Sequence, residues 1–558
     1  MTKTIPTYEK PTYEVLTELY SRLSELKNNR NKYISSKQVY AIYDEFLKEI
    51  HELSIVRKDE ELKGMSLNLP TPTDLLIDDV WQLLSLSFVT CGLIKFAPAT
   101  YSSLSTVFKL LTHLKECQVY SVDDLKPIHD RLSEIKEIIE KSEEVDEDED
   151  NGDEDAVNHK KEESLLLRNK LNKCQKVYDE LQKTFDEIPD DLEPIYAELI
   201  LLRKQLLNLL TREASELATA KAKMAAIAKQ LAGKLKKIEQ QRDENGKFKS
   251  DSATEAQLVS AQMGLNGLLD DCNNLLNDLN IQRDTTGISG KLEQLSLAEE
   301  NSEASTIFEG FKSLYLELAS LKQKLENLLI TRRWTMRETD LYNFQKLLKR
   351  IDDKRLELNK QISANCQGQA LRMIKRAQLL VLYLLRRCYS LIYKLLESSE
   401  PVSESLQPIH NQLSTVRRCL LEIKRIDGLN NLRELYPFQF KLASLDNLRH
   451  DGKFIVNNQV PEGQGTLNAL LAECFDIIHE LKIELEEKEE NGAGSDSSCD
   501  ERHDGNITDE EDKESDDEVE MKRKRYMGFN EADYDMASES EGEYLSLSDS
   551  EFESNDYY

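Results

Sequence analysis

Apolar residues recur three and four positions apart along most of this chain. The pattern is clearest in two stretches: Phe311, Leu314, Leu318, Leu321, Leu325 and Leu328; and Leu406, Ile409, Leu413, Val416, Leu420 and Ile423. Such spacing keeps the apolar side chains on one side of an α-helix, where they pack against a neighbouring helix. Strand-like alternation of Val, Ile and Thr is rare, and Gly and Pro are scarce. The pattern therefore predicts an all-α fold of the helical bundle or coiled-coil kind.

One helical pattern recurs with a proline in its first turn. Its three copies are Leu125-x-Pro127-Ile128-His129-x-x-Leu132, Leu192-x-Pro194-Ile195-Tyr196-x-x-Leu199 and Leu406-x-Pro408-Ile409-His410-x-x-Leu413, each followed four positions on by a basic residue (Lys136, Arg203 and Arg417). A shorter form places Tyr20 before Leu23, and Tyr315 before Leu318. Proline costs no hydrogen bond in a first helical turn, because the amides there have no acceptor within the helix. Each copy therefore predicts a helix start, with its His or Tyr ring packing beside the apolar seam.

The order of these patterns predicts two homologous helical units, residues 13–141 and 305–490. A middle helical region, 164–304, lies between them and contains a long helix from about 191 to 241. At 1.5 Å per residue this helix would be roughly 75 Å long. We expect it to join the two units, with its apolar seam open to pairing within the chain or in a homodimer.

Three segments are expected to lie outside the helical units: a frayed N-terminus (1–12), an acidic disordered linker (142–163) and an acidic Ser-rich disordered tail (491–558). The formal net charge is −31; residues 141–163 carry −9 and residues 491–558 carry −17, which leaves −5 for the rest. Segments this acidic bury too little apolar area to offset the entropy of ordering them. A nearly neutral body with acidic tails does not favour nucleic acid as a partner.

Nine cysteines occur singly, without paired spacing. Five lie in apolar helical patterns and are expected to be buried thiols in a reducing compartment: Cys91, Cys174, Cys388, Cys419 and Cys474. The longest uncharged run, residues 80–94, is too short to span a bilayer and predicts a helix buried on all sides. Residues 1–11 lack the apolar core of a secretory signal. We therefore expect no membrane partner.

The tail carries nine Ser and Thr residues with an acidic residue three positions on, the pattern of an acidophilic kinase of the casein-kinase-2 type. They are Ser497, Ser498, Thr508, Ser515, Ser538, Ser540, Ser546, Ser548 and Ser550. Each phosphate would add roughly −1.5 to −2 charges. A basic island within the tail, Lys522, Arg523, Lys524 and Arg525, is either a nuclear import signal or an internal partner of the surrounding acids.

Motifs for catalysis or for cofactor binding are not recognisable in the sequence. The eight histidines show no metal-ligand spacing. Residues 287–291 lack the first Gly and the final Ser or Thr of a phosphate loop. The sequence therefore offers no catalytic, cofactor-binding or metal-binding candidate, and we expect neither a cofactor nor an enzymatic activity.

The order of the motifs resembles an uncharacterised fungal protein family with two homologous helical units and an acidic tail, and is similar to its budding-yeast type. The resemblance implies a cytoplasmic and nuclear location and brings no active-site residues with it. We expect a non-enzymatic helical scaffold or adaptor that binds protein partners and is regulated by phosphorylation of its tail. Two alternatives stay open: an acidic chaperone for basic proteins such as histones, and an unrecognised enzyme with a site between the two helical units.

Overall fold

The computed structural model describes residues 5–63, 70–117, 119–148, 154–186, 188–189, 191–211, 218–243, 247–248, 255–284, 303–365, 369–426, 429 and 431–493. Residues 1–485 form one compact unit and residues 486–558 a second one. Among the described residues the secondary structure is almost all helical, with two short strands paired in one hairpin. This confirms the all-α prediction.

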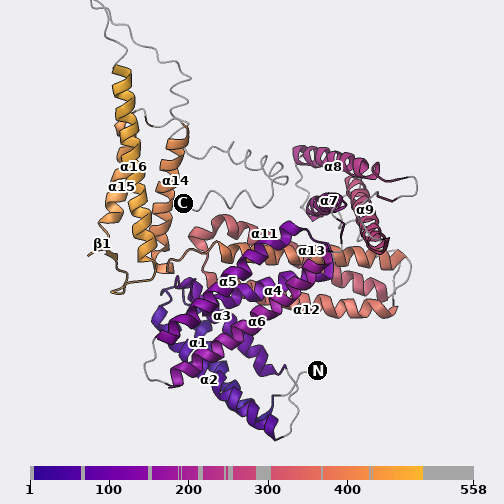
Figure 1. Ribbon diagram of the computed structural model, residues 1–558, viewed down its shortest axis with the longest axis horizontal. Helices are drawn as coiled ribbons and strands as arrows, with labels where there is room; N and C mark the ends of the chain where they lie inside the picture. The colour runs from indigo at the N-terminus through magenta and orange to yellow at the C-terminus, as the bar shows by residue number, and fades with distance from the viewer. Residues whose placement is uncertain are drawn as a thin grey trace, which may run out of the picture. The chain divides into compact units, whose positions relative to one another are not determined.

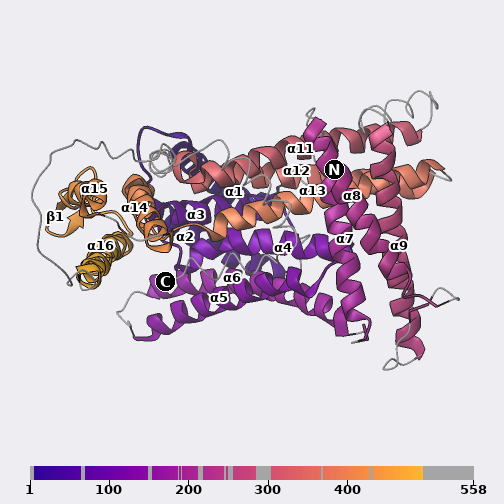
Figure 2. The same cartoon turned by 90° about the horizontal axis from the view of Figure 1, so that it is seen from above.

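The described helices fall into five groups of three successive helices, which we call helix triplets (Figures 1 and 2). The first two triplets are α1 (Lys10–Asn28), α2 (Ser36–Leu62) and α3 (Pro72–Thr90), and α4 (Thr100–Cys117), α5 (Val122–Asp148) and α6 (Glu154–Asp186). The next two are α7 (Glu193–Thr211), α8 (Ala218–Glu239) and α9 (Glu255–Asp284), and α11 (Glu303–Thr335), α12 (Leu341–Asn365) and α13 (Gln369–Glu397). The fifth is α14 (Gln407–Ile426), α15 (Tyr436–Asp446) and α16 (Gln464–Ala493).

Short elements start or connect these helices. They are the 3-10 helices η1 (Thr7–Glu9), η2 (Ala97–Ala99), η3 (Glu338–Asp340), η4 (Glu404–Leu406) and η5 (Leu432–Leu435), and the antiparallel strands β1 (Arg449–His450) and β2 (Lys453–Phe454). In each of the first four triplets the first helix packs against the third. In the fifth, two ion pairs seven residues apart on each helix, Arg417–Glu473 and Lys424–Glu480, show that α14 and α16 run parallel.

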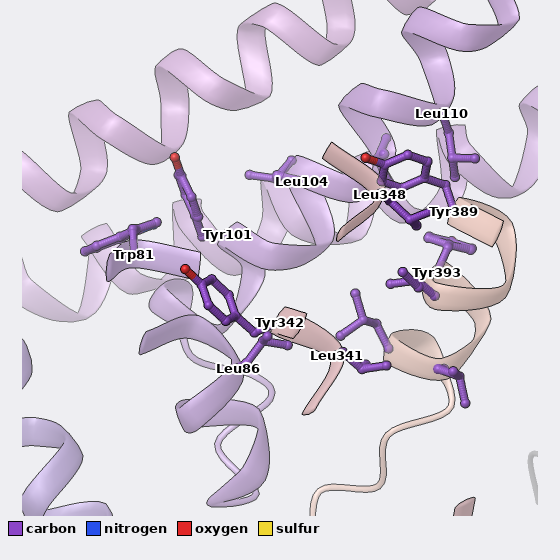
Figure 3. Close-up of a cluster of buried hydrophobic side chains, with 14 of the residues drawn as sticks. Trp81, Leu86, Tyr101, Leu104, Leu110, Leu341, Tyr342, Leu348, Tyr389 and Tyr393 are labelled. Carbon is purple, nitrogen blue, oxygen red and sulfur yellow. The ribbon is translucent and has the colours of Figure 1, made fainter. Parts of the chain in front are cut away.

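Three apolar clusters hold the described helices together. One is formed by α1–α6 together with α11–α13, a second by α7–α9, and a third by α14–α16. Figure 3 shows part of the first cluster, where Trp81 and Leu86 of α3 lie near Tyr101 of α4 and Tyr342 of α12. Residues from 16–181 and from 307–396 thus share one core, so the two halves of the chain interleave.

Helix α3 is the buried helix that the uncharged run predicts. From Val80 to Cys91 every residue except Gln82 is buried. The ring of Trp81 lies 5.2 Å from that of Phe46 and 5.5 Å from that of Tyr101. None of the described helices is both long and apolar enough to cross a membrane.

A thiol contact recurs in four of the five triplets. In each, a cysteine Sγ in the third helix donates to a leucine carbonyl in the first, at 3.6–3.9 Å: Cys174 to Leu104, Cys272 to Leu199, Cys388 to Leu318 and Cys474 to Leu413. Each of these leucines lies three residues after a ring: Tyr101, Tyr196, Tyr315 or His410. A small thiol lets two helices approach closely and still offers a weak donor. Three copies of the recurring pattern, in α7, α11 and α14, thus lie in helices that receive this contact. Among the described residues, the copy in α5 and the short form in α1 do not receive it.

The cysteine prediction is confirmed at four positions and wrong at one. Cys91, Cys174, Cys388 and Cys474 are buried, whereas Cys419 is exposed. Cys419 lies in α14 beside the buried Leu420, but it projects from the side of the helix that does not face the third cluster. The spacing of apolar residues does not show which of the two neighbours, Cys419 or Leu420, faces the core.

The third and fifth triplets share three further contacts. Arg203 pairs with Asp271, and Arg417 pairs with Glu473, in each case four residues after the leucine and one residue before the cysteine. The sequence Gly-Lys-Phe follows the second helix in both, and its phenylalanine (Phe248 or Phe454) is buried. The side-chain amide of Gln262 or Gln464 then bonds both backbone groups of that phenylalanine at 2.7–2.9 Å. These two triplets are built to the same plan.

The N-terminus is more ordered than the prediction of a frayed 1–12. Helix η1 begins at Thr7, and Pro11 occupies the first turn of α1, where a proline is tolerated. Glu9 is fully buried, and Arg57 donates to it at 2.9 Å. The prediction is therefore wrong for residues 5–12, because an ion pair to α2 holds this segment.

The acidic stretch 142–163 is also largely helical. Helix α5 continues to Asp148 and α6 starts at Glu154, so the prediction of a disordered linker holds for neither end; residues 149–153 lie outside the described residues. Glu163 accepts a hydrogen bond from Tyr43, and Glu162 lies 3.5 Å from His51. Residues of α2 thus contact acidic side chains that the charge of this segment alone would place in solvent.

The single helix expected from about 191 to 241 is two helices, α7 and α8. Leu206 of α7 and Ile238 of α8 belong to one buried cluster, although a straight helix would place them roughly 48 Å apart. Helices α7 and α8 therefore pack against each other, and α9 packs on both. The apolar residues that suggested a homodimer are buried in a cluster within this chain. The homodimer remains a prediction, but these residues do not support it.

Candidate functional site: an exposed apolar face on the fifth triplet

Helix α15 carries apolar residues on two opposite sides. Leu435, Leu442 and Leu445 are buried in the core of the fifth triplet. On the other side Leu432, Tyr436, Phe440 and Leu448 are exposed by 39%, 51%, 76% and 52%. Leu432, Tyr436 and Phe440 are four residues apart, so they lie along one side of η5 and α15, and Leu448 lies just beyond the end of α15. We call these four residues the exposed face.

The turn that follows α15 fixes this helix against α16. Asp451 and Gly452 have φ angles of 50° and 75°, the left-handed pair that a two-residue hairpin turn requires. The hairpin buries Phe454, whose backbone exchanges two hydrogen bonds of 2.9 Å with the side chain of Gln464. Because the opposite side of α15 is anchored in the core, the exposed face is held on a rigid support.

Basic residues flank the exposed face. Arg433 and Lys441 are exposed and lie one position after Leu432 and Phe440, on the adjoining row of the helix. Among the described residues neither base has an acidic side chain within ion-pair distance. Residues 407–460 carry eight Lys or Arg and five Asp or Glu, a net charge of +3 in a chain of −31. The surroundings of the face therefore favour an acidic ligand.

Two bases of α14 are engaged in ion pairs with α16. Arg417 lies 2.7 Å from Glu473, and Lys424 lies 2.7 Å from Glu480. The hydrogen bond from Glu480 raises the pKa of Lys424, and burial raises the pKa of the Cys474 thiol to about 11. These groups hold α14 against α16.

The two rings of the repeated pattern lie in apolar or aromatic surroundings. His410 is buried beside the core of the fifth triplet, and the ring of His129 stacks on Tyr178 at 5.4 Å. Within the described ranges no three His, Cys, Asp or Glu side chains gather as a metal site would require. The positions from Ser497 to Ser550 that predict phosphorylation, and the basic island at 522–525, lie outside the described residues.

Sequence reasoning missed the exposed face, although a signal was present. Between residues 432 and 448 the apolar residues are too many for one side of a helix. A helix that is apolar all round is normally buried. In α15 only one side is covered, and tertiary structure alone reveals which one.

Comparison with known proteins agrees with the repeated architecture. The family described as "Protein of unknown function (DUF2408)" matches residues 185–338 and 399–501, and these segments contain the third and fifth triplets. Two homologous helical units are thus confirmed, at bounds that differ from 13–141 and 305–490. No solved structure matches the chain.

Two yeast proteins are similar over most of the chain. The "Cu(2+) suppressing and bleomycin sensitive protein 1" of Saccharomyces cerevisiae is 42% identical, covering 88% of this chain and 93% of the relative. A CUB1 family protein of Schizosaccharomyces pombe is 33% identical, covering 90% of this chain and 98% of the relative. Such similarity over nearly full length confirms the resemblance to a fungal family, and this chain belongs to the CUB1 family of proteins that these two yeast relatives represent.

Proposed function

We propose that this protein is a non-enzymatic helical adaptor that binds a partner protein through the exposed face of α15. The observation that carries the proposal is the 76% exposure of Phe440 on a helix whose opposite side is already buried in a core. Aromatic residues grouped on a rigid surface are typical anchors of protein interfaces. Covering the face would bury apolar area without requiring the triplet to rearrange.

The partner that fits this face is an acidic segment with apolar residues at regular spacing. Leu432, Tyr436 and Phe440 form a row that an amphipathic helix of the partner would cover. Arg433 and Lys441 on the adjoining row would attract acids on that segment and set its orientation. The local charge of +3 within a strongly acidic chain supports this choice.

Phosphorylation of the tail is proposed as the regulatory step. Its nine acidic-context Ser and Thr positions, from Ser497 to Ser550, follow directly on the triplet that bears the face. An acidophilic kinase would make the tail a stronger polyanion. We place this regulated adaptor in the cytoplasm and the nucleus, in agreement with the basic island at 522–525 as an import signal.

The alternative functions rest on other parts of the chain. A chaperone for basic proteins such as histones would act through the acidic tail, which lies outside the described residues. An enzyme would require a polar cavity between the two halves of the chain. Both stay predictions, since neither explains the exposed face.

The test compares three full-length proteins as baits for affinity capture with quantitative mass spectrometry. Tyr436→Glu combined with Phe440→Glu should remove specific partners, because it places two acids on the apolar row. Leu62→Glu is the matched control, since Leu62 is an equally exposed apolar residue (86%) on α2. Thermal unfolding should be unchanged in both variants, as the altered side chains are exposed. Partners retained by the double variant at wild-type amounts would exclude the face as the binding site.

A further inference from the structure

A basic pocket of about 190 Å³ lies where three helix triplets meet. It is bounded by the end of α4, by α7 and by α13, and α13 contacts both of the other helices (Figures 1 and 2). Four basic side chains line it: Arg203, Lys204, Lys375 and Arg386. Glu116 is the one acidic residue in the lining. This concentration of positive charge stands out in a chain whose net charge is −31.

The negative charge of Glu116 is compensated by Arg355, a residue outside the pocket lining. Arg355, buried to 99%, lies 2.8 Å from Glu116 and 2.8 Å from Asp352. Lys204 lies 2.6 Å from Asp124. Burial opposes the charge on Asp124, yet Lys204 and Arg386 hold its pKa below the usual value. Lys375 is exposed and, among the described residues, has no acidic partner within ion-pair distance.

Arg203 presents a buried donor without an acceptor. It is 95% buried; its Nη2 lies 3.4 Å from Asp271 and its Nη1 lies 3.8 Å from the Sγ of Cys117. Its Nε has no hydrogen-bond partner within the described structure. A buried donor of this kind is costly unless a ligand or water completes it. Arg203, one of the residues that line the pocket, thus contains a buried donor without a hydrogen-bond partner among the described residues.

The homologous triplet shows why this donor is left open. At the matching position, Arg417 donates from Nε to Glu473 at 2.7 Å. The acid opposite Arg203 is Asp271, whose side chain is one methylene shorter than that of Glu473. The aspartate therefore meets Arg203 only at Nη2, and Nε stays available. The same repeat position thus pairs through Nε in α14, at Arg417, and leaves Nε without a hydrogen-bond partner from the described structure in α7, at Arg203.

We infer that this pocket binds the phosphate group of a small molecule. Lys375 has no acidic partner in the described part of the chain, whereas Arg203 and Lys204 are paired with Asp271 and Asp124, and Arg386 donates to the carbonyl of Val119. Two lysines and two arginines around one pocket still match the charge of a phosphate. The pocket is smaller than the roughly 300–1,000 Å³ of sites for drug-sized ligands, so the ligand is compact. Leu207 and Leu379 in the lining leave an apolar wall for a short carbon skeleton. This site is independent of the exposed face on α15.

The test measures binding to the full-length protein by titration calorimetry, with inorganic phosphate and glycerol 3-phosphate as separate probes. We expect at least one to bind, and the tighter of the two tells whether the phosphate is free or carried by a carbon skeleton. Lys375→Gln combined with Arg386→Gln should weaken binding by about tenfold or more. Arg387→Gln is the matched control, because Arg387 is an exposed neighbour on α13 outside the lining.

A second variant tests the open arginine without changing the net charge. Asp271→Glu should engage Nε of Arg203 as Glu473 engages Arg417, and so weaken binding of the same probe by several-fold. The side chain of Asp271 is 46% exposed, so the added methylene is accommodated. Absence of binding by both probes would overturn the inference. So would equal affinity in all variants, or binding of a phosphoserine peptide in place of either small probe.

Discussion

Nη2 of Arg203 in α7 lies 3.4 Å from the carboxylate of Asp271 in α9. The equivalent pair in the fifth triplet, Arg417 and Glu473, is closer, at 2.7 Å. The same helix-to-helix contact thus has two forms in one chain, and a single methylene separates them. In the closer pair Nε of Arg417 is hydrogen-bonded, whereas in the longer pair Nε of Arg203 has no hydrogen-bond partner among the described residues.

We expect the thiol contacts to control cysteine reactivity. Burial raises the pKa of Cys174 and of Cys388 to about 12, so little thiolate exists near neutral pH. Cys419 is exposed. Brief treatment of the native protein with iodoacetamide should therefore modify Cys419 well before Cys174 or Cys388, as followed by peptide mass spectrometry. Equal modification of the three would show that packing against the first helices, α4 and α11, does not protect Cys174 and Cys388.

Arg337 should be a major contributor to stability. It is 98% buried, donates to backbone carbonyls at the end of α1, including those of Lys27 and Asn29, and pairs with Glu404 at 2.7 Å. Arg337→Gln leaves a buried carboxylate and helix carbonyls without partners, so the free energy of unfolding should fall by about 3 kcal/mol.

The control for that measurement is Arg22→Gln. Arg22 pairs with Glu45 at the surface, where such pairs contribute about 0–1 kcal/mol. Urea unfolding of both variants gives the comparison. A similarly small loss of unfolding free energy in both variants would show that Arg337 does not stabilise the packing of α1, η3 and η4.

Acidification should destabilise the fold partly through His113. Burial lowers the pKa of this histidine, against the opposing effect of Asp352, whose carboxylate lies 3.4 Å from Nε2. Below about pH 6.5 the unfolded chain then binds more protons than the folded one, so stability falls as the pH drops toward the folded-state pKa. His113→Gln should reduce the difference between urea midpoints at about pH 7.5 and 5.5. An undiminished difference would assign the effect to other groups.

The two phenylalanine turns should respond alike to loss of their glutamine. Gln262→Ala and Gln464→Ala each remove two hydrogen bonds to the backbone of a buried phenylalanine. Each change should cost about 1–3 kcal/mol and speed amide exchange at Phe248 or Phe454. Hydrogen exchange with mass spectrometry locates the effect. Faster exchange in one turn only would contradict the shared plan of the two triplets.

The sequence predicts helices well and their partners poorly. The spacing of Leu406, Ile409 and Leu413 indicates a helix and its buried side, because both depend on local geometry. The contact from Cys474 to Leu413 joins residues 61 positions apart, and no local pattern contains that distance. The packing of α7 against α8 could not be predicted for the same reason: apolar spacing continues through both helices and does not show that one packs on the other.

The candidate sites show the same division. Arg203 belongs to the recurring pattern and is visible in the sequence, but its acid, Asp271, lies in another helix. Phe440 is one apolar residue among many in 432–448, and only the packing of Leu442 and Leu445 shows that it faces outward. Which side of a helix is covered depends on tertiary structure.

The most direct test of the adaptor function is photo-crosslinking from the exposed face in living cells. A photoreactive phenylalanine analogue replaces Phe440 in the full-length protein, and the control carries it at Lys48, an exposed position on α2. We expect adducts specific to position 440 that map to an acidic, apolar segment of a partner protein and disappear with Tyr436→Glu. The same adducts from both positions, or no adduct from position 440, would contradict the proposal that α15 is the binding surface.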